Sequence, residues 1–100
     1  MRIAIASEQE NENGLVCQTA GRAPYYLIYE NKKLEKIIKN PFAFGGGGAG
    51  FSVTQMLYNE KVELIVSGKF GDKMTTAIKD KGMNFKEVPS IPIKQALEEL

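Results

Sequence analysis

The sequence predicts an α/β fold, in which a mixed β-sheet carries helices on its faces. Residues 1–6 alternate in side-chain character with the period of two that a strand has. An aromatic and β-branched segment at 25–30 and an apolar segment at 33–39 resemble two paired strands. From residue 51 onward the apolar spacing changes to the period of a helix. Strands followed by alternating helices and strands indicate a sheet covered by helices.

The first quarter of the chain is expected to hold one long and one short strand. Residues 1–6 have small alanines between larger apolar residues, which is typical of a largely buried strand. Residues 7–14 contain no apolar side chain and predict a solvated loop. We expect a short strand at 15–17 and a connection at 18–24.

The segment 25–39 is predicted to form a β-hairpin. Its strands, 25–30 and 33–39, are separated by Asn31-Lys32. This pair fits a two-residue turn, because Asn tolerates positive φ better than most residues. Asn40-Pro41 should then end the second strand, since proline cannot continue a ladder.

The C-terminal half is predicted to alternate helices and strands. We expect helices at 50–60, 72–81 and 92–99, and strands at 62–66 and 83–88. The two strands should be parallel, because a helix connects them. Gly82 is placed to end one helix in the left-handed conformation, and Ser90 to cap the next. Glu63 should lie at a strand end or beside a cation, since an unpaired buried carboxylate is costly.

Composition excludes several classes of function. Thirteen Lys and Arg against twelve Asp and Glu give a net charge of +1, which removes the electrostatic case for nucleic-acid or acidic-membrane binding. With no histidine and one cysteine, Cys17, the chain lacks the residues for a Ser-His-Asp triad, a disulfide or a Cys₄ cluster site. No apolar run reaches the roughly 18 residues of a membrane span, and no signal peptide is recognised. We therefore expect a single cytoplasmic domain over residues 1–100.

Several motifs follow one another in an order and spacing that resembles a known family. They are Gly21-Arg22-Ala23-Pro24-Tyr25-Tyr26, Asn40-Pro41, Gly46-Gly47-Gly48-Ala49-Gly50, Val62–Gly68 and Phe70-Gly71-Asp72-Lys73. Together they resemble the dinitrogenase iron–molybdenum cofactor biosynthesis and binding family along the whole chain. The resemblance implies a ribonuclease H-like, three-layer α/β/α structure around a mixed five-stranded sheet. It also implies non-enzymatic binding or carriage of an iron–molybdenum–sulfur cluster or its precursor, with cofactor-assembly proteins as partners.

The glycine-rich stretch is the most unusual feature of the sequence. Gly45, Gly46, Gly47, Gly48 and Gly50 precede a predicted helix, so backbone N–H groups and the positive end of the helix dipole can meet an anion there. The stretch lacks the Lys-Ser/Thr ending of a phosphate-binding P-loop. The other interpretation is a tight loop that lets the helix pack close to the sheet.

Four further residues are candidates for binding an anion or a metal. Lys69, with Lys73, follows a predicted central strand, at the edge where α/β sheets bind ligands; both are equally well explained as solvated lysines. Arg22 is able to hold an anion through its planar guanidinium or to pin its own loop by pairing with a carboxylate. Cys17 is the one soft metal ligand, but a lone cysteine on a strand is more often a buried apolar residue.

Two hypotheses of different classes follow. The first is a non-enzymatic carrier of an anionic metal–sulfur cluster or another small anion, and the second is a protein-interaction or regulatory module of the same fold without cluster binding. An enzyme acting on a phosphorylated small molecule is a weaker third. A nuclease is disfavoured, because two-metal catalysis needs clustered carboxylates and the aspartates are only Asp72 and Asp80.

Overall fold

Five strands form one mixed sheet in the computed structural model, which describes residues 1–44 and 48–100. In chain order the elements are β1 (Arg2–Ser7), β2 (Tyr25–Glu30), β3 (Lys33–Lys39), α1 (Ala49–Asn59), β4 (Leu64–Ser67), α2 (Asp72–Asp80), β5 (Asn84–Glu87) and α3 (Ile93–Glu98). The strands lie in the order β3-β2-β1-β4-β5. β2 is antiparallel to both its neighbours, whereas β4 is parallel to β1 and β5. This arrangement confirms the mixed sheet and the parallel pair around α2.

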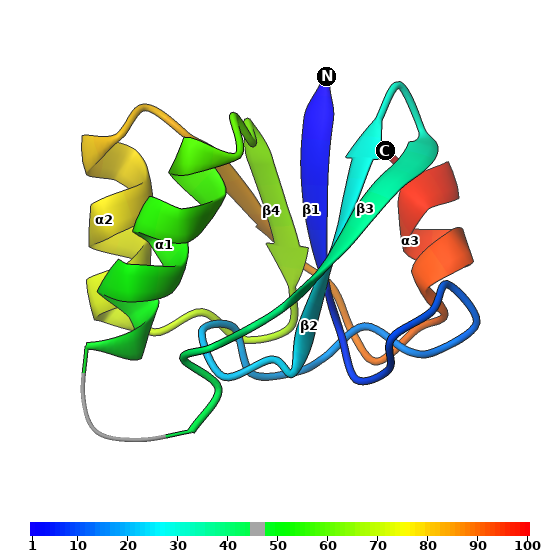
Figure 1. Ribbon diagram of the computed structural model, residues 1–100, viewed down its shortest axis with the longest axis horizontal. Helices are drawn as coiled ribbons and strands as arrows, with labels where there is room; N and C mark the ends of the chain where they lie inside the picture. The colour runs from blue at the N-terminus through cyan, green and yellow to red at the C-terminus, as the bar shows by residue number, and fades with distance from the viewer. Residues whose placement is uncertain (45–47) are drawn as a thin grey trace.

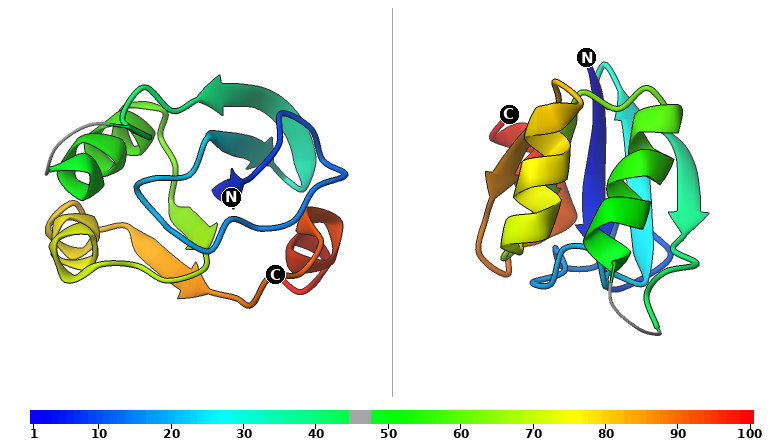
Figure 2. Two further views of the ribbon diagram at one scale, coloured as in Figure 1. Left: turned by 90° about the horizontal axis from the view of Figure 1, so that it is seen from below. Right: turned by 90° about the vertical axis from the view of Figure 1, so that its left-hand side faces the viewer.

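Helices cover both faces of the sheet. α1 and α2 lie side by side on one face, and α3 lies on the other (Figures 1 and 2). Alternate residues of β1 therefore enter different cores, as a period of two requires. Ala4 and Ala6 face α1 and α2, whereas Ile3 and Ile5 belong to the core on the side of α3. The three-layer α/β/α architecture is as expected.

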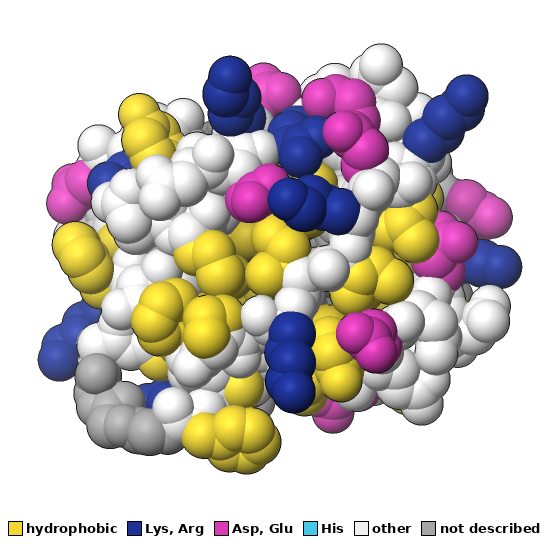
Figure 3. Space-filling model, viewed as in Figure 1, with side chains coloured by type: hydrophobic (Ala, Val, Ile, Leu, Met, Phe, Trp, Pro, Cys, Tyr) yellow, Lys and Arg dark blue, Asp and Glu magenta, His cyan; other side chains and the backbone are white. Residues whose placement is uncertain are grey.

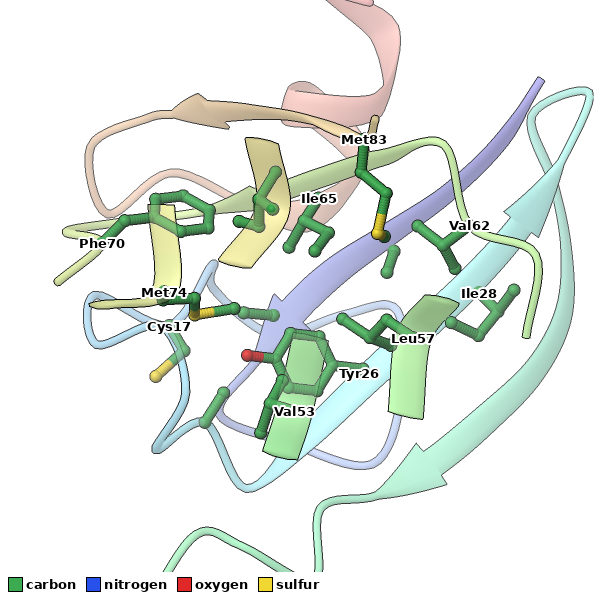
Figure 4. Packing of buried hydrophobic residues seen from close by; sticks show 14 residues of the cluster. Cys17, Tyr26, Ile28, Val53, Leu57, Val62, Ile65, Phe70, Met74 and Met83 are labelled. Carbon is green, nitrogen blue, oxygen red and sulfur yellow. The ribbon is translucent and has the colours of Figure 1, made fainter. Parts of the chain in front are cut away.

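The core beneath α1 and α2 is the one next to the candidate site, and we call it the helix-pair core. Figure 4 shows its side chains converging from the sheet and both helices. Its largest fully buried members are Tyr26, Ile28, Leu57, Ile65 and Ile78. Their burial removes apolar surface from water and fixes both helices on the sheet.

The local turn chemistry agrees with the sequence. Asn31 and Lys32 have φ of 52° and 67°, so both central residues of the hairpin adopt the positive φ of a type I′ turn. Gly82 has φ of 71° and directly follows Lys81, the C-cap of α2. The hairpin and the glycine that ends α2 are both confirmed.

Two local predictions are wrong. Residues 15–17 do not form a strand, because successive residues bond to different partners: Val16 N–H donates to Ile91 O, and Cys17 N–H donates to Ala6 O, each at 2.9 Å. Only isolated bridges result. Ser90 does not cap α3, because the helix begins after Pro92, and no side chain caps it.

Charged residues tie the strands together at the end of the sheet where β1 begins. Arg2 donates from Nε to Glu60 O at 2.6 Å and from Nη1 to Glu35 Oε2 at 2.9 Å. Glu63 is exposed just before β4, where its Oε2 accepts the backbone N–H of Arg2 at 3.1 Å, so it lies at a strand end as expected. Acidic and basic side chains intermingle along the upper end of the molecule in Figure 3.

None of the helices in the described ranges is long and apolar enough to cross a membrane.

Candidate anion-binding site

The N-termini of α1 and α2 open on the same end of the sheet, where β4 ends and β2 begins (lower end of Figure 1). The N-cap of α1 is Gly48, with φ of 87°, and the N-cap of α2 is Gly71. Neither helix start has a side-chain cap. The first N–H groups of a helix have no acceptor within it, and the helix dipole makes this end partly positive. Two helix ends suited to negative charge therefore lie together.

A pocket of about 350 Å³ lies at these two helix starts. Three segments line it, at 20–22, 48–50 and 71–74. A Cβ built on Gly48 or Gly71 would meet no atom within 4 Å, so both N-caps border open space. Neither N-cap places a side chain between its helix start and this space.

Gly21 brings the third segment against the first turn of α1. A Cβ on Gly21 would lie 3.5 Å from the Cα of Gly50, and Gly21 has φ of 84°. A Cβ at this distance is in ordinary van der Waals contact, but a side chain would be strained by the positive φ. Glycine is therefore favoured here by backbone conformation.

Arg22 follows Gly21 and is half-buried at the pocket lining. Its Nη1 donates to the backbone oxygen of Phe42 at 3.4 Å. The guanidinium is thus held near the pocket by a carbonyl of the segment that leads into the glycine-rich stretch. A partly buried guanidinium is suited to a charge-assisted contact with an anion.

Asn40 holds the same two segments together, a role that the sequence analysis missed. It is 4% exposed, and its Nδ2 donates to Gly21 O at 3.0 Å and to Ala23 O at 2.9 Å. Its Oδ1 accepts the N–H of Phe42 at 2.9 Å. The sequence signal was an Asn directly before the proline that ends β3, but its partners are visible only in the fold.

The two lysines expected near the anion lie in different places. Lys73, in the first turn of α2, lines the pocket. Lys69 lines a separate hollow with Phe70 and Glu87, and its backbone pairs with that of Gln18. Together with Arg22, Lys73 gives the lining two positive charges against the single negative charge of Asp72.

The predicted glycines divide between described and undescribed residues. Gly45, Gly46 and Gly47 lie outside the described residues. Gly48 and Gly50 lie within them and line the pocket. The part of the glycine-rich stretch that the structure describes is therefore the part that starts α1.

Cys17 belongs to the helix-pair core and is 4% exposed. Burial, with a smaller contribution from the nearby Glu8 and an opposing one from a backbone hydrogen bond with Thr19, raises the pKa of its thiol to about 11. The thiol therefore keeps its proton at neutral pH, whereas metal ligation needs the thiolate. Among residues 1–44 and 48–100, no three His, Cys, Asp or Glu residues are grouped to hold a metal ion.

A larger hollow of about 570 Å³ lies at the opposite ends of α1 and α2. Its lining includes Lys61 and Lys81, which follow the last turns of the two helices. Helix C-termini present carbonyl oxygens and partial negative charge, so these lysines complement the helix dipoles. Both helix dipoles thus favour an anion at the 350 Å³ pocket over this hollow.

Known structures of similar fold come from bacteria and archaea. The apo form of the orange protein from Desulfovibrio gigas superposes with a TM-score of 0.90 at 24% identity, covering 98% of this chain and 84% of that one. A NifB-like protein from Thermotoga gives a TM-score of 0.82 at 23% identity, covering 97% and 84% of the two chains. A dinitrogenase-like protein from Methanocaldococcus jannaschii gives 0.67 at 12% identity, again covering 97% and 84%. At these identities the likeness establishes the fold.

Family membership rests on the sequence itself. No curated protein matches the chain significantly. The family described as dinitrogenase iron-molybdenum cofactor matches residues 1–100. Because this match extends from the first residue to the last, the chain belongs to the dinitrogenase iron–molybdenum cofactor family.

Proposed function

We propose that this protein is a non-enzymatic carrier of a small anionic metal–sulfur cluster, of the iron–molybdenum cofactor type or a precursor of it. The observation that carries the proposal is the meeting of two uncapped helix N-termini at one pocket, beside Arg22 and Lys73. Backbone N–H groups and positive side chains bind a multiply charged anion without any thiolate. Membership of a family related to this cofactor supports the same cargo.

The placement of the two aspartates disfavours two-metal catalysis. Asp72 and Asp80 are the first and last residues of α2, so about 12 Å of helix separates their Cα atoms. That distance is too long for two carboxylates to share a metal pair, whose ions lie about 4 Å apart. We propose that the chain carries the cluster in the cytoplasm and passes it to cofactor-assembly proteins.

The sharpest test places a side chain where the anion would bind without disturbing the fold. Gly71 has φ of −78° and ψ of 160°, an extended conformation that any residue adopts, and it borders open space. An Asp at an N-cap accepts N–H groups of the first helical turn and usually stabilises the helix. Gly71→Asp should therefore fold at least as stably as the wild type, while its carboxylate occupies the donors and repels an anion.

Tetrathiomolybdate is a suitable probe, followed by its visible absorption during titration. We expect Gly71→Asp to weaken binding tenfold or more, which corresponds to about 1.4 kcal/mol. Gly71→Ser should cap the helix without charge and weaken binding less. Ser90→Asp, an exposed position before α3, adds the same charge on the other side of the sheet and should bind like the wild type. Equal affinity in a folded Gly71→Asp variant would remove this pocket from the function.

A protein-interaction module is the second candidate, favoured by two exposed aromatic residues. Phe44 is 92% exposed and Phe51 is 61% exposed, and they flank the glycine-rich stretch in the sequence. Large exposed apolar side chains that form one patch are typical of contact surfaces. If the wild-type protein binds neither thiomolybdate nor an iron–molybdenum–sulfur cluster, this second function replaces the first.

A further inference from the structure

Asn40 is one of the few buried polar residues of the described chain, and its amide makes contacts on both sides of Arg22. The Nδ2 group donates to the carbonyl before Arg22, on Gly21, and to the carbonyl after it, on Ala23. These two bonds, of 3.0 and 2.9 Å, hold the peptide group that precedes the Arg22 Cα and the Ala23–Pro24 peptide group, one residue beyond it. One side chain therefore restrains the backbone on both sides of the residue from which the guanidinium extends.

The same amide also holds the residue whose carbonyl accepts from the Arg22 side chain. Oδ1 of Asn40 accepts the N–H of Phe42, and the carbonyl of Phe42 accepts the Nη1 of Arg22. Asn40 thus restrains the backbone around Arg22 and supports one acceptor of its guanidinium. Its own backbone N–H donates to Pro24 O at 2.9 Å, which anchors it to the same loop.

We propose that Asn40 is the positioning residue of the anion pocket, acting through the orientation of Arg22. The proposal rests on the proposed function, because it takes the pocket at 20–22, 48–50 and 71–74 as the binding site. This arrangement strengthens anion binding, because a guanidinium that is ordered before the anion arrives loses less side-chain entropy on binding.

The contacts require an amide in particular. Two carbonyls face one end of the side chain and one N–H faces the other, so the residue must donate at one end and accept at the other. A carboxylate of the same shape would place an oxygen against two carbonyl oxygens. Alanine would leave the buried carbonyls without this partner, which costs stability.

A measurement on the protein without ligand tests the positioning directly. The chain has two arginines, Arg2 and Arg22, so its arginine Nε–H groups give two signals in a ¹⁵N NMR spectrum. In the wild type we expect both to be ordered on the nanosecond timescale. In Asn40→Ala the order parameter of the Arg22 Nε–H should fall clearly, while that of Arg2, at the far end of the sheet, stays unchanged. An unchanged Arg22 signal in a folded variant would overturn the proposal.

A double-mutant cycle then tests the effect on binding. We expect Arg22→Gln and Asn40→Ala each to weaken tetrathiomolybdate binding about tenfold. The double variant should be no more than about twofold weaker than Arg22→Gln alone, because Asn40 acts only through Arg22. A hundredfold loss in the double variant, meaning independent effects, would overturn the proposal.

Two controls separate positioning from general destabilisation. Ile93→Val removes a methylene from the core beneath α3, lowers the melting temperature, and should leave both binding and the Arg22 signal unchanged. Asn40→Ser keeps one hydroxyl able to reach part of the network, and it provides the folded variant should Asn40→Ala fail to fold; it should reduce the Arg22 order parameter partially. If the wild type binds no thiomolybdate, the proposed function fails, and the NMR measurement still decides whether Asn40 positions Arg22.

Discussion

Gly50 lies directly against Met74, where the first turns of α1 and α2 meet. A Cβ on Gly50 would be 2.9 Å from the Cβ of Met74 and 3.3 Å from its backbone nitrogen. The neighbour at this contact is mostly backbone and Cβ, which do not move aside by a rotamer change. The distance between the two helix starts is therefore set by the absence of a side chain at residue 50.

Gly50→Ala should destabilise the protein by about 1–3 kcal/mol, the usual cost of overpacking a close contact. α1 has to shift away from α2 to admit the methyl group. Gly71→Ala is the matched control, since its Cβ would meet nothing within 4 Å, and it should change stability by well under 1 kcal/mol. Urea denaturation of the three proteins measures both effects; equal stability of the two variants would contradict the contact.

A substitution in the hairpin turn is expected to stabilise the protein. Lys32 has φ of 67° between β2 and β3, a conformation that costs little for glycine and more for residues with a Cβ. Lys32→Gly should therefore stabilise the protein by about 0.5–1 kcal/mol, giving the Asn-Gly sequence that type I′ turns prefer.

Lys33→Gly, one residue further along in β3, is the control for this change. It removes the same kind of charged side chain, but from a strand position, so it should destabilise. Thermal unfolding of both variants decides the question, and a lower melting temperature for Lys32→Gly would show that the turn is not of this type.

Sequence features within a few adjacent residues predict most of the fold. The features that the sequence does not reveal depend on contacts between residues far apart in the chain. The hairpin and the glycine after α2 depend on a few adjacent residues, and both were predicted. The strand expected at 15–17 depended on pairing, and that segment bonds partly to β1 and partly to residues 91–92. A short apolar run cannot reveal whether its partners form one ladder or two.

In the candidate site, too, local features are visible in the sequence and long-range contacts are not. Glycine at a helix start is visible in the sequence, and Gly48 and Gly50 indeed line the pocket. The lysine beside them could not be chosen from sequence, because the path of the chain after β4 depends on Gly68 packing against Gln18. That contact leads Lys69 toward Gln18 and leaves Lys73 at the helix start.

Cys17 should make the stability of the protein fall in alkaline solution. Its pKa is raised by burial from 9.0 to about 11 in the folded state, so between these pH values the folded chain holds a proton that the unfolded chain has lost. Stability from this group is complete below pH 9 and is lost as the pH rises through 11, by about 2–3 kcal/mol.

Cys17→Ala removes this contribution, so the difference between the two proteins isolates it. Burial also raises the pKa of Tyr26 and Tyr29, but both proteins share those groups. Urea denaturation from pH 8 to 11 should show the stability of the wild type falling faster than that of the variant. Parallel pH profiles would mean that the thiol is not buried as the structure has it.

A substitution of Cys17 also tests whether its thiol is a metal ligand. If Cys17 is a core residue, Cys17→Ser should lower the melting temperature and leave tetrathiomolybdate affinity within about twofold of the wild type. If it is a ligand, the variant should lose binding at temperatures where it is fully folded. The visible absorption titration distinguishes the two outcomes, with circular dichroism confirming that the variant is folded.

Asp72 opposes the anion that the rest of the pocket attracts. It lies in the first turn of α2 and lines the pocket with Arg22 and Lys73. An acidic residue here stabilises the helix through its dipole, by about 0.3–1 kcal/mol. Asp72→Asn should therefore destabilise the protein slightly and strengthen thiomolybdate binding about two- to fivefold, since a nearby negative charge is removed. The gain in affinity should shrink as salt is raised, because the group is exposed and screened.

Asp80→Asn makes the same charge change at the other end of α2, about 12 Å away, and should leave the affinity nearly unchanged. Equal gains from both variants would mean that overall charge, and not this pocket, determines anion binding.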